Sequence, residues 1–421
     1  MDGIPGWTIL AYLDGNGELE PEIAAAYYEL EAAAADGQTR VLLEAGRLEQ
    51  STVQIIRPGT RPEQEIWDGV RRHELNAGEK VLTQDLGRIN MADPKSLYDF
   101  LLWGLKNTDT DHVMLVLGGH ACEYIGLMND YSGKYPVIMG IPELAATLEM
   151  AANAVGRVID LLVIDACYCN NIETLYELGY RENSAVKTLI TYREYAGAKG
   201  ISFRKLLKTA GKSGTASPAE LADRICSEVS SDLVARAVQS ENLGQLKRLF
   251  DSLGRKALCS KTRSTAGPSG LLTKEAGENK YEWDEANEIF RIVSDLTIGQ
   301  ETKARYPGRE IGILEQYLPN KGLAALYYRL AFARDNAWTQ LLCSQLNEKQ
   351  YTFLIAIGFS PLLISEGKVR ALIESCNPWA DAFTVDTILK GLIEKREWDK
   401  RLFPNLYQKI AENISLLSKS F

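Results

Sequence analysis

The chain has 421 residues, enough for one large α/β domain and a second unit. Its formal net charge of −9 gives a phosphate backbone no general attraction, so nucleic acid is not an expected partner. Its seven cysteines are odd in number and lack zinc-ligand spacing, which argues against a disulfide-stapled scaffold and a structural zinc site.

The ends and apolar stretches of the chain bear on its location. The first residues lack a Lys/Arg-rich start and a small-residue cleavage site, so they do not resemble a secretory signal. The longest late apolar stretch, around Phe353–Ile364, is broken by Gly358 and Pro361 and is too short to cross a bilayer. We therefore expect a soluble, cytoplasmic protein with reduced thiols and no membrane partner.

The first third of the chain alternates strand-like and helix-like segments. Trp7–Leu13 is a β-branched and aromatic run that ends at the turn Asp14–Gly17. Glu20–Ala35 has strong helix composition, and Arg40–Glu44 is a second short strand. The alternating segment Ser51–Glu74 predicts a small hairpin beside the main sheet.

The pattern sharpens after Asp93-Pro94, where an N-cap residue and a proline open a helix that runs to about Lys106. Apolar strands and helices then alternate in chain order: strand His112–Leu117, helix Ile141–Val155, strand Ile159–Ile164, helix Asn171–Leu178 and strand Val186–Thr191. Strands that are apolar throughout, separated by helices, predict a mostly parallel sheet covered on both faces.

The second half of the chain has a different character. Helical segments such as Pro218–Val238 and Gly322–Leu346 dominate, and the Ser/Thr/Gly/Pro-rich stretch 259–279 is typical of a mobile loop. We therefore expect a catalytic-type domain over residues 1–210. Residues 211–421 should form a mainly helical region that completes the core, regulates the site or binds a protein partner.

Two residues suited to nucleophilic catalysis follow buried strands. His120 and Cys167 each come just past a strand's carboxyl end, the edge where parallel sheets bind ligands. A thiolate that attacks and an imidazole that activates it form the machinery of cysteine proteases. The Ala166-Cys167 pair, with a histidine about 50 residues upstream, matches the arrangement in caspases, although Asp165 replaces the caspase glutamine.

The chain has only three histidines, which narrows the choice of base. His73 lies among charged neighbours and is expected on a solvated face. His112 begins its strand, at the end opposite to the expected site. His120 is therefore the candidate base.

Several segments together resemble the clostripain-like cysteine peptidases, relatives of caspases, gingipains and separase. They are WTILAYLDGNGELE, ADPKSLYDFLLWGLKNTDTDHVMLVLGGH, IDLLVIDACYCNNIETLYEL and TYREYAGAKGISFRKLL. The resemblance runs from Trp7 to about Leu207, roughly half of the chain. It implies a caspase-like three-layer α/β/α fold and hydrolysis of a protein or peptide substrate.

The resemblance also implies roles for individual residues. Cys167 would be the nucleophile and His120 the base, with the oxyanion hole formed by the N–H groups of Cys167 and Ala121. The family usually has glycine where Ala121 stands. Asp165 would lie near the floor of the S1 pocket, the pocket for the side chain before the cut bond, and would accept Arg or Lys there.

Activation is a further implication, because many relatives cleave their own chain after a basic residue. Candidate cut sites are Lys134, Lys261 and Arg263, so the chain is expected to be a zymogen activated by self-cleavage or by a partner. No cofactor is required, but some relatives need calcium. Asp14, Asn16 and Glu18 alternate after the first strand as candidate ligands, without an EF-hand pattern.

Two other functions stay open at this stage. The Ala121 departure leaves room for a catalytically inactive caspase-fold scaffold that binds other proteins. A doubly wound nucleotide-binding protein would need a Gly-rich phosphate loop after the first strand, and the turn DGNG is too short for one.

Overall fold

The computed structural model describes residues 4–239, apart from 36–38, 60–66, 77–78, 123–125, 134–136, 180–183 and 198, together with scattered helical residues between 242 and 292. The chain divides into two compact units, Met1–Gln239 and Ser240–Phe421. The predicted loop 259–279 and the helical segment Gly322–Leu346 lie outside the described residues.

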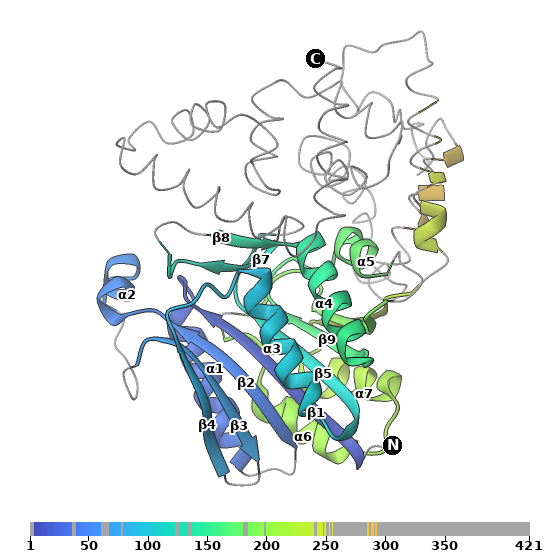
Figure 1. Ribbon diagram of the computed structural model, residues 1–421. Helices are drawn as coiled ribbons and strands as arrows, with labels where there is room; N and C mark the ends of the chain where they lie inside the picture. The colour runs from blue at the N-terminus through green and yellow to red at the C-terminus, as the bar shows by residue number, and fades with distance from the viewer. Residues whose placement is uncertain are drawn as a thin grey trace, which may run out of the picture. The chain divides into compact units, whose positions relative to one another are not determined.

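An eight-stranded sheet forms the centre of the first unit (Figure 1). Its spatial order is β11-β10-β9-β5-β1-β2-β3-β4. The strands are β1 (Ile4–Gly15), β2 (Arg40–Arg47), β3 (Gly69–Asn76), β4 (Glu79–Gly87), β5 (Thr110–Gly118), β9 (Ile159–Asp165), β10 (Val186–Tyr192) and β11 (Leu233–Ala237). The five strands β1, β2, β5, β9 and β10 are parallel, and β3, β4 and β11 are antiparallel to their neighbours. The predicted, mostly parallel sheet is confirmed.

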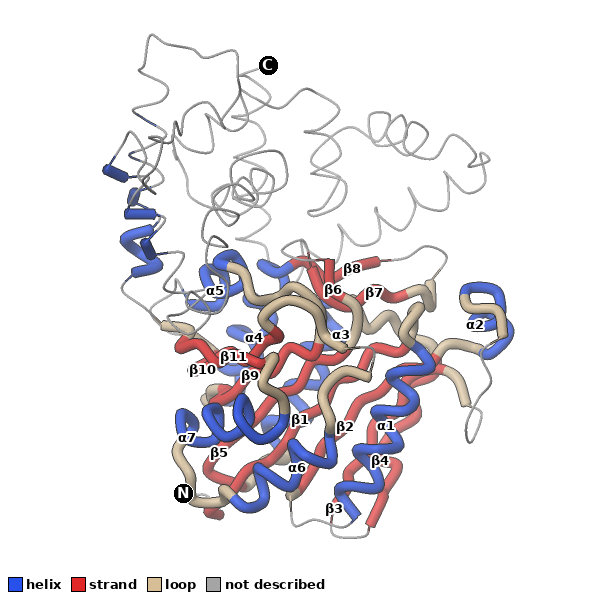
Figure 2. The backbone as a smooth tube through the Cα atoms, turned by 180° about the vertical axis from the view of Figure 1, so that it is seen from behind, coloured by secondary structure: helices blue, strands red, loops and turns tan. Residues whose placement is uncertain are grey.

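One face of this sheet is covered by the helices α1 (Glu20–Ala35), α6 (Phe203–Lys212) and α7 (Pro218–Arg224), as Figure 2 shows. Alternate side chains of the central strands meet them in one apolar core. Examples from β1, α1 and α6 are Ile9, Leu30 and Phe203, which are all fully buried.

The other face carries α3 (Pro94–Lys106), α4 (Ile141–Val155) and α5 (Ile172–Gly179). Tyr12 of β1 packs there against Phe100 of α3, with ring centroids 5.2 Å apart. The predicted cap of α3 is present, because the Asp93 side chain accepts a hydrogen bond from the Lys95 N–H. The three-layer α/β/α fold is thereby confirmed.

A three-stranded antiparallel sheet follows β5 and consists of β6 (Ala121–Cys122), β7 (Gly126–Asp130) and β8 (Val137–Gly140). Met128 interrupts its register and has a φ of 60°, a left-handed conformation that is rare for a non-glycine residue. The Met128 N–H donates to the His120 carbonyl oxygen at 2.9 Å. The bulge thus fixes the backbone of the candidate base.

The structure differs from the sequence prediction at both sheet edges. Only part of the predicted hairpin 51–74 is strand: its beginning forms the short helix α2 (Gln50–Ile56), and the hairpin is β3–β4. The segment predicted as helix Pro218–Val238 is α7, then a π-helical turn at Ile225–Val229, then β11. Pairing of β11 with β10 draws the chain beyond residue 210 into the sheet, so the first unit ends at Gln239.

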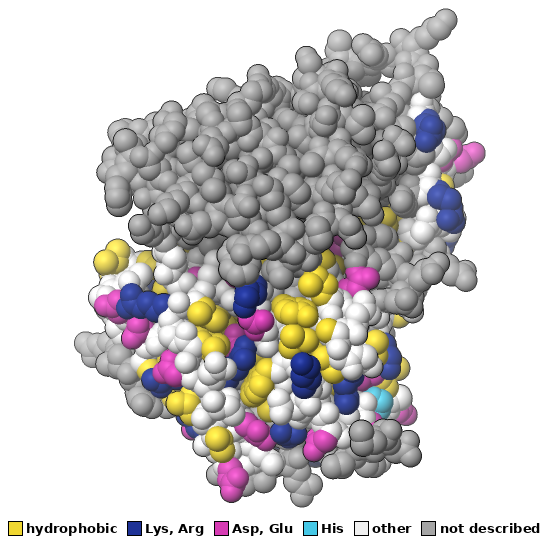
Figure 3. Space-filling model, in the orientation of Figure 1, with side chains coloured by type: hydrophobic (Ala, Val, Ile, Leu, Met, Phe, Trp, Pro, Cys, Tyr) yellow, Lys and Arg dark blue, Asp and Glu magenta, His cyan; other side chains and the backbone are white. Residues whose placement is uncertain are grey.

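The exposed face over α3 and α4 mixes apolar with charged side chains (Figure 3). Within the part of the chain described, no helix combines the length and apolarity needed to cross a membrane.

Candidate active site

Two neighbouring strands deliver His120 and Cys167 to the same edge of the sheet. Strands β5 and β9 are parallel and paired, and Gly118 and Asp165, the last residue of each, are register partners. His120 lies two residues beyond Gly118, and Cys167 lies two residues beyond Asp165. The predicted nucleophile and base therefore leave the sheet from paired positions, in the same direction.

Cys167 is partly buried and packs against the apolar core. Its Sγ lies 3.8 Å from the carbonyl oxygen of Ala196, in the loop after β10. The second thiol of the CxC, Cys169, is fully buried and its Sγ lies 3.4 Å from the Cys167 carbonyl oxygen. Burial, and then the neighbouring Cys167, raise the pKa of Cys169 far above its usual range. Of the two thiols, Cys167 is therefore the one suited to attack a substrate.

The residue after Cys167 is strained. Tyr168 has a φ of 57°, and its N–H donates to the Glu194 carbonyl oxygen at 2.5 Å. The Tyr168 ring is half exposed and lies 6.5 Å, between ring centroids, from the exposed ring of Tyr195. The loop after β10 thus holds the turn that carries Cys167.

His120 is partly exposed, and its side chain meets a carboxylate. The His120 Nε2 lies 3.4 Å from Glu18 Oε2. Glu18 follows β1, the other strand that pairs with β5.

The other two histidines lie elsewhere. His112 stacks on Trp7 at the beginning of β5, as predicted, whereas His73 is buried in β3 rather than solvated. Burial lowers the pKa of His73 to about 4, which keeps this histidine neutral.

The backbone N–H of Ala121, a candidate oxyanion donor, is not used in the pairing of β6 with β7. It faces Leu127 across β6 and β7, and the flanking bond runs from the Met128 N–H to the His120 carbonyl. In an antiparallel ladder this arrangement makes Ala121 and Leu127 a non-hydrogen-bonded pair, so the Ala121 N–H points away from β7. Ala121 also has no positive φ, so the position does not demand glycine.

Asp165, the candidate S1 residue, is held by the loop after β10. Its Oδ1 accepts a hydrogen bond from the Ile201 N–H at 2.9 Å, and the Tyr192 hydroxyl donates to the same carboxylate. Burial raises the pKa of Asp165 to about 6, against these hydrogen bonds. A Cβ on Gly200 would lie 2.6 Å from Asp165 Oδ2, so the loop approaches the carboxylate as closely as glycine allows.

The three candidate calcium ligands have different surroundings. Asp14 and Asn16 are buried, and the Asn16 side chain donates to Asp130 at 2.8 Å. Glu18 is half exposed and directed to His120. Among the described residues, no group of three or more His, Cys, Asp or Glu side chains is arranged to hold a metal ion. The candidate cut sites Lys134, Lys261 and Arg263 lie outside the described residues.

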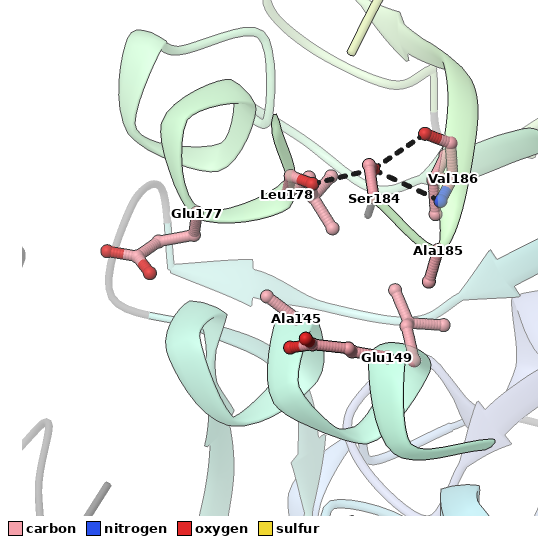
Figure 4. Close-up of a pocket in the computed structure, with 8 residues that line it drawn as sticks. Ala145, Glu149, Glu177, Leu178, Ser184, Ala185 and Val186 are labelled. Atoms are coloured by element: carbon pink, nitrogen blue, oxygen red, sulfur yellow. Dashed lines mark hydrogen bonds between the residues drawn. The ribbon is translucent and has the colours of Figure 1, made fainter. Parts of the chain in front are cut away.

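A small pocket lies between α4, α5 and β10, apart from the Cys167 and His120 edge (Figure 4). Glu149 and Glu177 line it with apolar side chains, and Ser184 bonds to the backbone beside it. Glu177 is buried, and burial raises its pKa to about 8. Neither a cysteine nor a histidine lines this pocket, so it is separate from the candidate site.

Sequence reasoning missed the contact between Glu18 and His120, and the contact of Ala196 with Cys167. A signal existed for the first, because Glu18 follows a strand that ends at the same edge as His120. No sequence signal existed for the contact with Ala196, because Ala196 contributes its backbone carbonyl, a group that every residue has.

Comparisons with known proteins point to one peptidase family. The model of the clostripain family matches residues 63–246, a range that includes His120, Asp165 and Cys167 but not the segment from Trp7 to Glu20. No curated protein matches the chain.

Similar solved structures include a secreted C11 cysteine protease from Bacteroides thetaiotaomicron bound to an irreversible peptide inhibitor, with 15% identity and a TM-score of 0.42 over 59% of this chain and 70% of that one. Another is an inactive zymogen C11 protease from Parabacteroides distasonis, with 14% identity and a TM-score of 0.45 over 70% of this chain and 82% of that one. By this match, residues 63–246 are similar to the clostripain family of cysteine peptidases.

Proposed function

We propose that this peptidase is an endopeptidase that cuts after Arg or Lys, with Cys167 as nucleophile and His120 as base. The observation that carries the proposal is the register of β5 and β9. Gly118 and Asp165 are paired at the strand ends, and His120 and Cys167 each follow two residues later. Parallel strands with such ends are a common setting for catalytic groups.

The reaction follows from the chemistry of these groups. His120 accepts the Cys167 proton, and the thiolate forms a C–S bond to the carbonyl carbon of the substrate. The N–H groups of Cys167 and Ala121 stabilise the oxyanion of the tetrahedral intermediate. As the intermediate collapses, His120 gives its proton to the leaving amine and a thioester remains. His120 then takes a proton from water, whose oxygen attacks the thioester and restores the thiol and a carboxylic acid.

Asp165 supports the preference for a basic residue. It is partly buried at the strand end two residues before the nucleophile, and burial raises its pKa, so a cationic partner would stabilise its charged form. A guanidinium or ammonium group in the S1 pocket would supply that charge. Such charge-assisted hydrogen bonds are stronger than neutral ones.

We further propose that the chain is made as a zymogen that cuts itself after Lys134, Lys261 or Arg263, or is activated by a protein partner of residues 211–421. Lys134 falls between β7 and β8, close in sequence to the bulge that holds His120. The reaction needs no cofactor, and the free thiol suits a reducing compartment such as the cytoplasm.

The test is turnover of fluorogenic peptides with Arg, Lys or Asp at the P1 position. Wild type is measured beside Cys167→Ala, His120→Ala and the control Cys226→Ala, with calcium and with a chelator. We expect cleavage after Arg and Lys, lost in the first two variants and kept in the third. Mass spectrometry of the chain reports cuts at the three basic sites, which Cys167→Ala should not show. If a properly folded wild type with a cut chain leaves every peptide intact, the proposal is wrong and the inactive scaffold remains.

A further inference from the structure

We infer that Glu18 is a positioning residue for His120, which makes the site a chain of three side chains rather than two. The inference rests on the proposed function. Its basis is the approach of Glu18 Oε2 to His120 Nε2, 3.4 Å apart. A carboxylate against one imidazole nitrogen is the arrangement that orients histidine bases in other hydrolases.

The backbone of Glu18 is held in place. It lies in the turn between β1 and α1, and Leu13 of β1 is the register partner of Gly118 of β5. The turn is closed by the Glu20 N–H, which donates to the Gly17 carbonyl oxygen at 3.1 Å. Arg57 Nη1 also donates a hydrogen bond to the Glu18 carbonyl oxygen at 3.1 Å. The turn therefore brings Glu18 to the edge where β5 releases His120.

The side chain of Glu18 is held by a second contact. The Tyr131 hydroxyl donates to Glu18 Oε1 at 3.1 Å, and Asn129 Nδ2 donates to the Tyr131 hydroxyl oxygen at 3.0 Å. Burial, and then the Glu18 charge, raise the pKa of Tyr131, so the hydroxyl keeps its proton at neutral pH. The Tyr131 N–H in turn donates to the Asn16 carbonyl oxygen at 2.6 Å. One carboxylate oxygen is thus occupied by Tyr131, and the other faces the imidazole.

This arrangement gives the histidine a defined tautomer. A proton on Nε2 of His120 faces the Glu18 carboxylate, which leaves Nδ1 as the nitrogen that takes the proton of Cys167. After that transfer, the carboxylate also faces a positively charged ring. Both side chains of the pair are partly exposed, at 36% for His120 and 49% for Glu18, so the effect on the rate is moderate.

The decisive variant is Glu18→Gln, which removes the charge and keeps the length of the side chain. We expect kcat to fall about fivefold with KM unchanged, the size measured for partly exposed ion pairs. Tyr131→Phe should cause a smaller loss. In the double variant, the Tyr131 change should cost nothing further, because it acts through Glu18. Glu22→Gln is the matched control, since Glu22 pairs with Arg57 near the same turn rather than with His120.

A second readout separates this inference from the proposed function. The rate at which iodoacetamide alkylates Cys167, followed by mass spectrometry, reports formation of the thiolate without any peptide substrate. We expect Glu18→Gln to slow it by a similar factor and Glu22→Gln to leave it unchanged. Equal alkylation rates for wild type and Glu18→Gln would overturn the role of Glu18. Slower alkylation in a protein that cuts no peptide would keep that role and reject the proposed function.

Discussion

Gly118 and Asp165 are register partners at the ends of β5 and β9, and the candidate base and nucleophile each follow two residues later. This pairing joins two residues that are far apart in the chain. Because parallel strands end at one edge, the alignment of two strand ends is enough to bring a thiol and an imidazole to one site. The loops after the two strands therefore need only a few residues to carry these side chains to the site.

The first prediction concerns charge in the S1 pocket. Asp165→Asn should lower kcat/KM for Arg and Lys peptides by about thirtyfold, since a charged hydrogen bond contributes about 2 kcal/mol. Peptides with a neutral P1 residue should be affected much less. The pKa of Asp165 is raised to about 6, so its charge is present above pH 6 and is lost as the pH falls through that value.

The pH dependence gives this prediction its control. In wild type, the ratio of kcat/KM for Arg peptides to that for neutral peptides should fall as the pH drops below about 6. In Asp165→Asn the ratio should stay flat, because the catalytic steps are common to both peptides and only the P1 contact differs. A ratio in wild type that does not change between pH 5 and pH 8 would argue that Asp165 only caps the strand.

The second prediction uses the close approach of Gly200 to Asp165. Gly200 has a φ of 62°, and an added Cβ would lie 2.6 Å from Asp165 Oδ2. Gly200→Ala should therefore displace the carboxylate and lower the free energy of unfolding by about 1 kcal/mol or more. The same loop offers the control Gly197→Ala, where a Cβ meets nothing within 4 Å. Peptide turnover and urea unfolding of both variants check this, and equal behaviour of the two would contradict it.

Much of the site could be predicted because it depends on the buried pattern of the strands. Continuous apolar runs predict parallel strands, and the residues after them must lie at one edge, so the placement of His120 and Cys167 at the same edge could be predicted from the sequence. The burial of His73 could not be, because its charged neighbours Arg71 and Arg72 are typical of a solvated strand. The structure places Arg72 against the buried Glu44 instead, with Nε and Oε2 2.5 Å apart.

The outer strand β11 shows a second limit. The sequence Pro218–Val238 favours a helix at its beginning, with a Ser217 cap and a proline, and that helix is present as α7. Its last residues pair with β10, because an open edge of the sheet offers unpaired backbone groups. Local propensity does not report such tertiary pairing. The Glu18 contact was missed for a similar reason, because the direction of a half-exposed side chain follows from its neighbours rather than from its own segment.

The third prediction concerns a buried ion pair beneath the site. Arg47 Nη2 lies 2.6 Å from Glu20 Oε1, and both side chains are 3% exposed. Arg47→Met should lower the free energy of unfolding by about 3–5 kcal/mol, because it leaves the Glu20 charge buried without its cationic partner. The control is Arg57→Met, which removes a partly exposed pair with Glu22 and should cost less than about 1 kcal/mol. Urea denaturation at pH 7 measures both, and similar losses in the two variants would be inconsistent with the role of burial.

The fourth prediction concerns Glu177, which is buried beside the small pocket (Figure 4). Its Oε1 has no hydrogen-bond partner within the described part of the chain, and burial raises its pKa from 4.5 to about 8. The unfolded chain loses this proton near pH 4.5, whereas the folded protein holds it up to about pH 8. The free energy of unfolding must therefore fall as the pH rises through this window.

Glu177→Gln removes that titration and keeps the shape of the side chain. It should raise the free energy of unfolding by about 1–3 kcal/mol at pH 8, the cost of an unsatisfied buried polar group, and change it little at pH 4.5. Glu149→Gln, on the opposite side of the same pocket and less buried, should leave the slope with pH unchanged. Thermal unfolding of the three proteins across pH 4.5–8 is the measurement. If the difference between wild type and Glu177→Gln is the same at both ends of this range, Glu177 is ionised in the folded protein and the pocket is more polar than its lining indicates.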